Sequence, residues 1–171
     1  MSNDPYVSLA RRSLEAYITT RKVIDVPKDL CNEMTERQAG AFVSLHKNND
    51  LRGCIGTIAP TTGSIAEEII RNAIRAATAD PRFPEVTPDE LTDLTIKVDV
   101  LGPIEDITSP SELDIKRYGV IVRKDNRMGL LLPDLEGITG VEQQIQIAKL
   151  KAGIAPYEEV ELQRFEVIRH S

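Results

Sequence analysis

The sequence predicts an α+β fold in which largely antiparallel strands pack with helices. Three observations support this prediction. Residues 40–58 and 118–132 each contain two apolar runs joined by a short polar turn, the pattern of a hairpin. Helix-start signals stand before, between and after these hairpins. Neither a repeat nor a domain linker interrupts residues 1–171, so we expect a single domain with its core in about residues 6–168.

The first half of the chain is expected to form two helices and one hairpin. Asp4-Pro5 is a helix N-cap followed by proline in the first turn, and Ser64-x-x-Glu67 is a capping box. The expected elements are a helix over 6–20, a connection with at most a short helical turn over 21–39, strands over 40–46 and 51–58 around a turn at 47–50, and a helix over 64–78. In this register Val43 faces Cys54, and His46 lies on the opposite face of the sheet from Cys54.

The second half begins with a loop, because two prolines restrict residues 80–84. The expected elements after it are a short helical turn from Thr87-x-x-Glu90, a strand over 94–101, a short helix near 111–113, strands over 118–123 and 128–132, a helix from a capping box at Thr139 to a C-cap at Gly153, and a strand over 160–168. The apolar alternation of the last strand slips by one residue, which predicts a bulge near residues 163–164.

The composition argues against several classes of partner. Asp plus Glu number 27 against 21 Lys plus Arg, and the net charge of −6 repels polyanions. With no Trp and 4% aromatic residues, the chain offers few side chains for stacking unpaired bases. We therefore expect neither nucleic acid nor an anionic membrane as a main partner. The first residues lack the features of a secretory signal, and no segment has membrane-spanning length, so we expect a cytoplasmic protein.

The cysteines and histidines give little support for a metal site. Cys31, Cys54, His46 and His170 show neither Cys-x-x-Cys nor His-x-x-x-His spacing, so no metal ligand is predicted. Without an export signal, the two cysteines are expected to be reduced thiols. The chain lacks the glycine-rich motifs of common nucleotide sites, and its cofactors stay unassigned.

The best candidate for chemistry is Leu51–Thr57, with the sequence Leu-Arg-Gly-Cys-Ile-Gly-Thr. In a strand Arg52 and Cys54 point to the same side, where a guanidinium stabilises a thiolate. Gly53 and Gly56 allow a ligand to approach the main chain closely, and their N–H groups can bind an oxyanion. The predicted catalytic residues are Cys54 and Arg52, and the predicted ligand-binding residues of this stretch are Gly53, Gly56 and Thr57.

A structural role for the same stretch stays open. Cys54 can be a small buried residue, and Arg52 can be an ion-paired side chain that covers the end of the strand. Asp80 and Asp99 are the carboxylates that the fold is expected to bring to Arg52 in that case. In addition, neither histidine is placed by the sequence to serve as a base for the thiol.

The loop at residues 80–84 is the second candidate. A loop arginine beside an aromatic ring can hold an anionic group while the ring closes an apolar wall. We therefore predict Asp80, Arg82 and Phe83 as further ligand-binding residues. The alternative is that Phe83 anchors the loop in the core and Arg82 caps a helix end.

These stretches together resemble one known family. Leu51–Thr57, followed by Pro60, a helix and Asp80-Pro81-Arg82-Phe83-Pro84, is similar to the AMMECR domain family, whose prokaryotic members are called AmmeMemoRadiSam system protein A. Further similar stretches are Leu94–Leu101, Tyr118-Gly119-Val120, Gly129–Pro133 and Lys151-Ala152-Gly153. The resemblance covers about residues 6–168 and implies two lobes, one of which contains both termini.

The resemblance implies no settled biochemical activity, so two functions stay open. In the first, the protein is an enzyme or a small-ligand binder whose cleft is lined by Leu51–Thr57 and the loop at residues 80–83. In the second, it is a non-catalytic interaction module whose groove receives a segment of another protein. The family's name implies a pathway shared with two expected partners, a Memo-like protein similar to non-haem dioxygenases and a radical S-adenosylmethionine protein.

Overall fold

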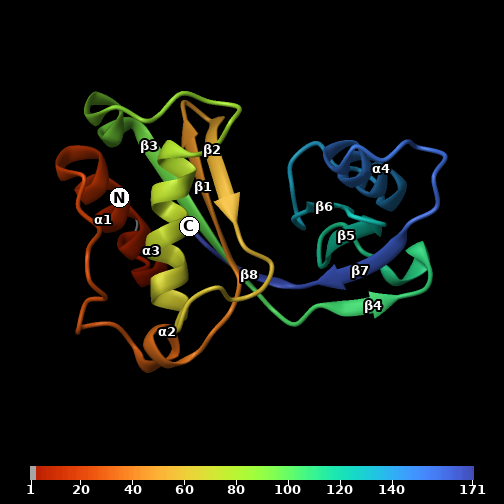
Figure 1. The fold of residues 1–171 in the computed structure, drawn as a ribbon, viewed down its shortest axis with the longest axis horizontal. Helices are drawn as coiled ribbons and strands as arrows, with labels where there is room; N and C mark the ends of the chain where they lie inside the picture. Colours follow the sequence, from red (N-terminus) through yellow and green to blue (C-terminus); the bar gives the residue numbers. More distant parts are fainter. Residues whose placement is uncertain (1–2) are drawn as a thin grey trace. The chain divides into compact units, whose positions relative to one another are not determined.

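A computed structural model of the protein describes residues 3–171, which form two compact units. The first unit extends to Leu101 and also includes Ile168–Ser171, whereas the second is Gly102–Val167 (Figure 1). Each unit has a four-stranded sheet and helices of its own. The α+β fold is therefore confirmed, and both ends of the described chain belong to one unit.

The first unit is built on a sheet with the strand order β2-β1-β3-β8, in which β1 is antiparallel to β2 and β3. Its elements are α1 (Pro5–Thr20), α2 (Asn32–Glu36), α3 (Ile65–Thr78), the 3-10 helix η1 (Pro88–Asp93), β1 (Ala41–Lys47), β2 (Asp50–Gly56), β3 (Leu94–Leu101) and β8 (Val167–His170). The N-caps of α1 and α3 are those expected. Asp4 accepts hydrogen bonds from the N–H groups of Tyr6 and Val7, and Ser64 accepts one from the N–H of Glu67.

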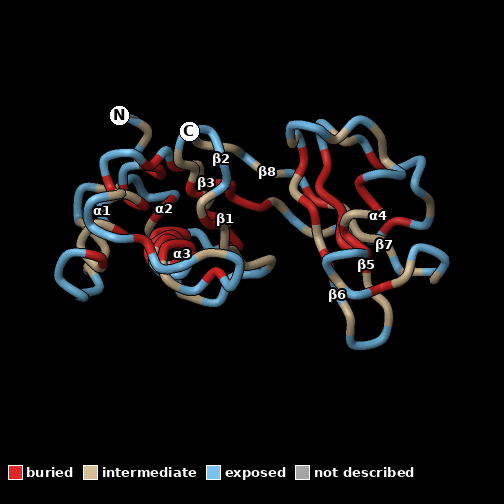
Figure 2. Tube along the Cα trace, turned by 90° about the horizontal axis from the view of Figure 1, so that it is seen from above, coloured by how far each residue is buried: buried red, intermediate tan, exposed pale blue. Residues whose placement is uncertain are grey.

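One face of this sheet lies against α3 and α1 and carries the core of the first unit. Val43 and Leu45 of β1 and Val98 of β3 are fully buried on that face, as their alternation with polar residues predicts. Much of α3, which contacts β1 and β2, is buried (Figure 2). The opposite face of the sheet carries the residues that alternate with the core, which are mostly polar apart from Phe42.

The first hairpin has a shorter loop than the sequence predicts. Only Asn48 and Asn49 connect β1 to β2, and their φ angles are 53° and 66°. A two-residue loop with both φ angles positive matches the twist of the strands, and asparagine tolerates that conformation. The predicted four-residue turn at 47–50 is therefore wrong.

A β-bulge at Arg52 changes the register of the rest of β2. His46 faces Leu51 as expected, but the register then shifts, and Cys54 faces Ser44. The predicted pairing of Cys54 with Val43 is therefore wrong. The extra residue in one strand moves every later side chain of β2 to the other face relative to β1.

The second unit has a sheet with the strand order β4-β7-β5-β6, and α4 packs on β5 and β6. Its elements are β4 (Glu105–Ile107), the 3-10 helix η2 (Pro110–Glu112), β5 (Gly119–Lys124), β6 (Arg127–Leu131), α4 (Val141–Ala152) and β7 (Glu161–Phe165). Strand β4 was not predicted. Gly129 lets α4 approach closely, since a Cβ there would lie 2.1 Å from the main-chain oxygen of Ala148.

Two boundaries of the second unit differ from the prediction. The N-cap of α4 is Gly140 instead of Thr139, whose N–H and hydroxyl bond the side chain of Gln143. The predicted bulge near residues 163–164 is absent, because β7 pairs regularly with β5 up to Phe165. The strand ends at Phe165, and after Glu166 the chain continues as β8 in the first sheet. The slip in apolar alternation thus marks a change of sheet.

Candidate functional site

Leu51–Thr57 forms most of β2, an edge strand of the first sheet, and both of its glycines are closely packed. A Cβ on Gly53 would lie 2.2 Å from the main-chain oxygen of Ala76 in α3. A Cβ on Gly56 would lie 2.2 Å from Cγ of Phe42 in β1. Close contacts within the fold therefore account for both glycines, and their predicted contact with a ligand stays a prediction.

The bulge at Arg52 places Cys54 and His46 on the same face of the sheet. Cys54 lies opposite Ser44, and side chains two residues apart along a strand, such as those of Ser44 and His46, share a face. The prediction that His46 and Cys54 occupy opposite faces is therefore wrong. Cys54 is half-buried, Cys31 is exposed, and no disulfide joins the two thiols.

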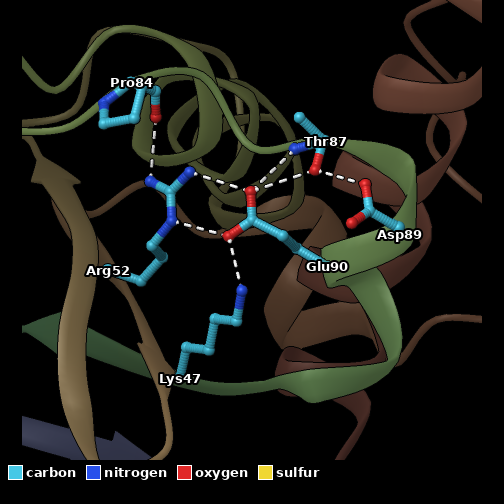
Figure 3. Close-up of polar contacts among 6 residues, drawn as sticks. All are labelled: Lys47, Arg52, Pro84, Thr87, Asp89 and Glu90. Atoms are coloured by element: carbon cyan, nitrogen blue, oxygen red, sulfur yellow. Dashed lines mark hydrogen bonds and ion pairs between the residues drawn. The ribbon is translucent and has the colours of Figure 1, made fainter.

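Arg52 binds Glu90 and not either of the carboxylates that the sequence suggested. Its Nε and Nη2 donate to the two carboxylate oxygens at 2.9 and 3.0 Å, and its Nη1 donates to the main-chain oxygen of Pro84 at 2.8 Å (Figure 3). The hydrogen bonds from Arg52, with weaker support from the Thr87 N–H and Lys47, lower the pKa of Glu90 to about 2. Arg52 therefore fastens β2 to the loop at Pro84 and to η1.

Asp80 joins the edge of β2 to the loop that follows α3. Its Oδ2 accepts the main-chain N–H of Cys54 at 3.0 Å and Nη2 of Arg82 at 2.8 Å, and its Oδ1 accepts Nε of Arg82 at 3.0 Å. The side chain is only 3% exposed. The hydrogen bonds from Arg82 are the main reason that the pKa of Asp80 falls to about 2. The other suggested carboxylate, Asp99, binds Arg169 at 2.7 Å.

Arg82 carries a guanidinium group that interacts electrostatically with Cys54. Its pKa is raised, mainly by the hydrogen bond to Asp80 and in smaller part by the neighbouring Cys54. Its side chain is 51% exposed, and Cζ lies 5.4 Å from the centre of the Phe83 ring. The structure thus brings Cys54, Asp80, Arg82 and Phe83 together and gives Arg52 a separate partner.

Thr57 belongs to a network around a buried carboxylate that sequence reasoning missed. The Thr57 hydroxyl donates to Glu68 at 2.6 Å and accepts a hydrogen bond from Nδ2 of Asn72 at 3.2 Å. Glu68 also accepts hydrogen bonds from the N–H and hydroxyl groups of Thr61 and Thr62. The available signal was an acidic residue on the apolar side of α3, preceded by three threonines that can donate to it.

Residues 3–171 offer no ready metal centre. No group of three or more His, Cys, Asp and Glu side chains in this range is placed to hold an ion. None of the helices described there is both long enough and apolar enough to cross a membrane. What the cluster at β2 offers chemically is a thiol, an exposed guanidinium and an aromatic ring.

Fold and site together define a two-unit α+β protein with a cysteine on an edge strand between two tightly packed glycines. The chain belongs to the AMMECR1 family, whose sequence profile matches residues 7–170. The family expected from the sequence is therefore confirmed. The crystal structure of the uncharacterized protein PH0010 from Pyrococcus horikoshii is similar, with a TM-score of 0.89 and 36% sequence identity over 96% of this chain and 88% of that one.

Two bacterial relatives are more similar in sequence. A protein of Thermotoga maritima is 54% identical over 168 residues, which cover 97% of each chain. A protein of Clostridium acetobutylicum is also 54% identical over 168 residues, which cover 98% of this chain but 36% of the relative. This chain thus spans about a third of the clostridial protein, which joins a domain of this kind to further sequence.

Proposed function

We propose that the protein binds a small ligand at the edge of the first sheet. In this proposal the Cys54 thiol and the Arg82 guanidinium contact the ligand. The observation that carries this proposal is the double role of Asp80, which accepts hydrogen bonds from both residues. One nearly buried carboxylate thereby binds both the main chain of the half-buried Cys54 and an exposed cation. A cation next to a cysteine favours the reactive thiolate.

The enzyme form of this proposal gives Cys54 the role of nucleophile. Arg82 then supplies the charge stabilisation that the sequence suggested for Arg52, and Arg52 acts as a positioning residue through Glu90. Phe83 provides an apolar wall beside the guanidinium. In this form the two glycines and Thr57 have structural roles in β2 and just after it. Gly53 and Gly56 pack closely against neighbouring elements, and Thr57 is hydrogen-bonded to Glu68.

Alkylation of the native protein with iodoacetamide tests this function, because Cys31 is an internal control. Exposure alone predicts that the exposed Cys31 reacts faster than the half-buried Cys54. A functional thiol beside Arg82 predicts the reverse order at pH 7. The rates are measured by mass spectrometry of the two cysteine-containing peptides. A Cys54 that stays unmodified in folded protein rules out the nucleophile.

A second function, a non-catalytic interaction module, is favoured by the clostridial relative. Because this chain corresponds to 36% of that protein, a domain similar to this chain is part of a longer polypeptide there. The partners proposed for this chain are a Memo-like protein and a radical S-adenosylmethionine protein. If the loop around Arg82 is the contact, Arg82→Ala abolishes co-purification with the Memo-like protein, whereas the exposed Arg71→Ala does not. Unchanged co-purification of Arg82→Ala excludes this surface.

A further inference from the structure

The face of the first sheet that carries Cys54 also carries polar residues of β1 and β3. The pairings of β1 with β2 and β3 define three rows across this face. The rows are Leu51–His46–Thr95, Cys54–Ser44–Lys97 and Gly56–Phe42–Asp99. The bulge at Arg52 creates this arrangement, because without it Cys54 would lie on the core face of β1. The thiol therefore shares its row with a hydroxyl and an ammonium group.

Lys97 is the cation of this face that has no anionic partner. Within residues 3–171 its ammonium group forms no ion pair or hydrogen bond, although the residue is half-buried. By contrast, the other cations near this face are paired. Arg52 binds Glu90, and Arg82 binds Asp80. In the next row Asp99 is bound by Arg169. A partly desolvated ammonium group gains from an opposite charge, so this position is suited to an anion that comes from outside the chain.

His46 supplies a second unsatisfied group next to Lys97. Its Nδ1 is buried and has no hydrogen-bond partner among the described residues. Burial, and in smaller part the charge of Lys97, lowers the pKa of His46, so that the ring is neutral at pH 7. Buried polar atoms are nearly always hydrogen-bonded, which makes the imidazole available to a bound ligand or to water.

We propose that this face binds a small ligand that carries an oxyanion, with the anionic group on Lys97 and the reactive end of the ligand against Cys54. The proposal rests on the function proposed above and adds the ligand class and a binding residue outside β2. Neighbouring strands are about 4.8 Å apart, so Cys54 and Lys97 flank Ser44 at about twice that spacing. A flexible lysine side chain can span much of that distance, which limits the ligand to a few atoms between its two ends.

Two alkylating reagents that differ in charge test the proposal. In both iodoacetate and iodoacetamide, the Cys54 thiolate displaces iodide from carbon, a C–S bond replaces the C–I bond, and the thiol proton goes to solvent. A change in thiol ionisation scales both rates equally, so the ratio of the two rates reports on attraction of the carboxylate. The measurement uses the full chain with Cys31→Ser, since serine is a good N-cap for α2 and leaves one thiol.

Replacing Lys97 should change this ratio. We expect Lys97→Met to lower the ratio of the iodoacetate to the iodoacetamide rate by about threefold or more at low salt, as the loss of one nearby charge predicts. Lys97→Arg should keep the ratio. Lys22→Met, which removes one exposed charge after α1, should also keep it. Lys97→Gln replaces Lys97→Met if the methionine variant does not fold, as judged by circular dichroism.

The outcomes separate the two proposals. If Cys54 reacts but the ratio is the same with and without Lys97, the oxyanion site is wrong and the function proposed above stands. If Cys54 reacts with neither reagent in folded protein, both proposals fail. Protection of Cys54 against iodoacetamide by inorganic phosphate or by acetate, lost in Lys97→Met, identifies which oxyanion the face prefers. Protection by neither salt at concentrations up to about the millimolar range, where weak ligands bind, counts against the site.

Discussion

Arg52 and Glu90 form a two-point ion pair, with Nε–Oε2 and Nη2–Oε1 distances of 2.9 and 3.0 Å. The two residues are 38 positions apart in the chain, and each side chain is 12% exposed. The guanidinium also holds the main-chain oxygen of Pro84 (Figure 3). The arginine closest in sequence to Cys54 therefore contributes to the fold through a distant carboxylate, which leaves Arg82 as the cation beside the thiol.

The first prediction concerns stability at this ion pair. Arg52→Ala leaves Glu90 largely buried without its two-point partner, and we expect a loss of about 2–3 kcal/mol in the free energy of unfolding. Lys47→Ala is the matched control, because Lys47 makes one contact with Glu90 at 3.2 Å and is 34% exposed. That variant should lose less than about 1 kcal/mol. Urea denaturation measures both, and equal losses would contradict the two-point pair.

The second prediction concerns the reactivity of Cys54. Arg82→Ala removes the exposed cation beside the thiol but leaves the Cys54 N–H bonded to Asp80. We expect the iodoacetamide rate of Cys54 at pH 7 to fall about threefold to tenfold, because a nearby cation stabilises the thiolate. Arg71→Ala, which removes an exposed charge from α3, is the control. An unchanged rate in Arg82→Ala would remove Arg82 from the site.

The third prediction concerns the pH dependence of stability at Asp80. The pKa of this carboxyl is about 2 in the folded protein, against 3.8 ordinarily. Because the folded-state pKa is the lower one, Asp80 stabilises the fold fully above pH 4, and this contribution, about 2 kcal/mol, is lost as the pH falls towards 2. The free-energy difference between wild type and Asp80→Asn should therefore shrink over that range.

Arg82→Ala provides the control for the pH experiment. Since the hydrogen bonds from Arg82 are the main cause of the lowered pKa of Asp80, this variant should be less stable than wild type at pH 6 but should lose less additional stability as the pH falls towards 2. Urea denaturation at intervals between pH 2 and pH 6 measures all three proteins. A wild-type advantage over Asp80→Asn that is constant across this range would mean that Asp80 carries no favourable charge interaction.

Most of the fold could be predicted from local signals. Asp4 and Ser64 cap the helices that their sequence patterns predict, because an N-cap needs only the next three residues. The alternation of apolar and polar residues over 94–101 predicts a strand with the same bounds as β3. The bulge at Arg52 could not be predicted, since an extra residue in a strand depends on distant partners such as Glu90. The change of sheet after Phe165 depends likewise on which strand is the neighbour.

The candidate site was predictable in its residue types but not in its pairings. The stretch around Cys54 and the loop at Arg82 were singled out by composition, and Asp80 indeed connects them. The sequence favoured Arg52 as the cation beside the thiol. The tertiary structure pairs Arg52 with Glu90 and places Arg82 beside Cys54 instead. The rows across the sheet that include Lys97 depend on a one-residue register shift. Sequence periodicity alone has no means to detect that shift.

The fourth prediction separates two reasons for the glycine at position 56. If Gly56 is there to make room for the Phe42 ring, Gly56→Ala should lower the free energy of unfolding by about 1–3 kcal/mol, because a Cβ would lie 2.2 Å from Cγ of that ring. This steric clash between the added Cβ and the Phe42 ring should be absent when the ring is removed. In the Phe42→Ala background, Gly56→Ala should therefore cost at least about 1 kcal/mol less, which a double-mutant cycle by urea denaturation detects.

Two further glycines complete this experiment. Gly63→Ala should be nearly neutral, since the nearest atom to its added Cβ is a flexible Glu67 oxygen at 3.7 Å. Gly53→Ala should be costly in both backgrounds, because its Cβ meets the main-chain oxygen of Ala76, which cannot move aside without a shift of α3. If Gly56→Ala leaves stability unchanged yet alters Cys54 alkylation, the glycine serves ligand access, as the sequence first suggested. A stability loss relieved by Phe42→Ala instead assigns Gly56 to the sheet.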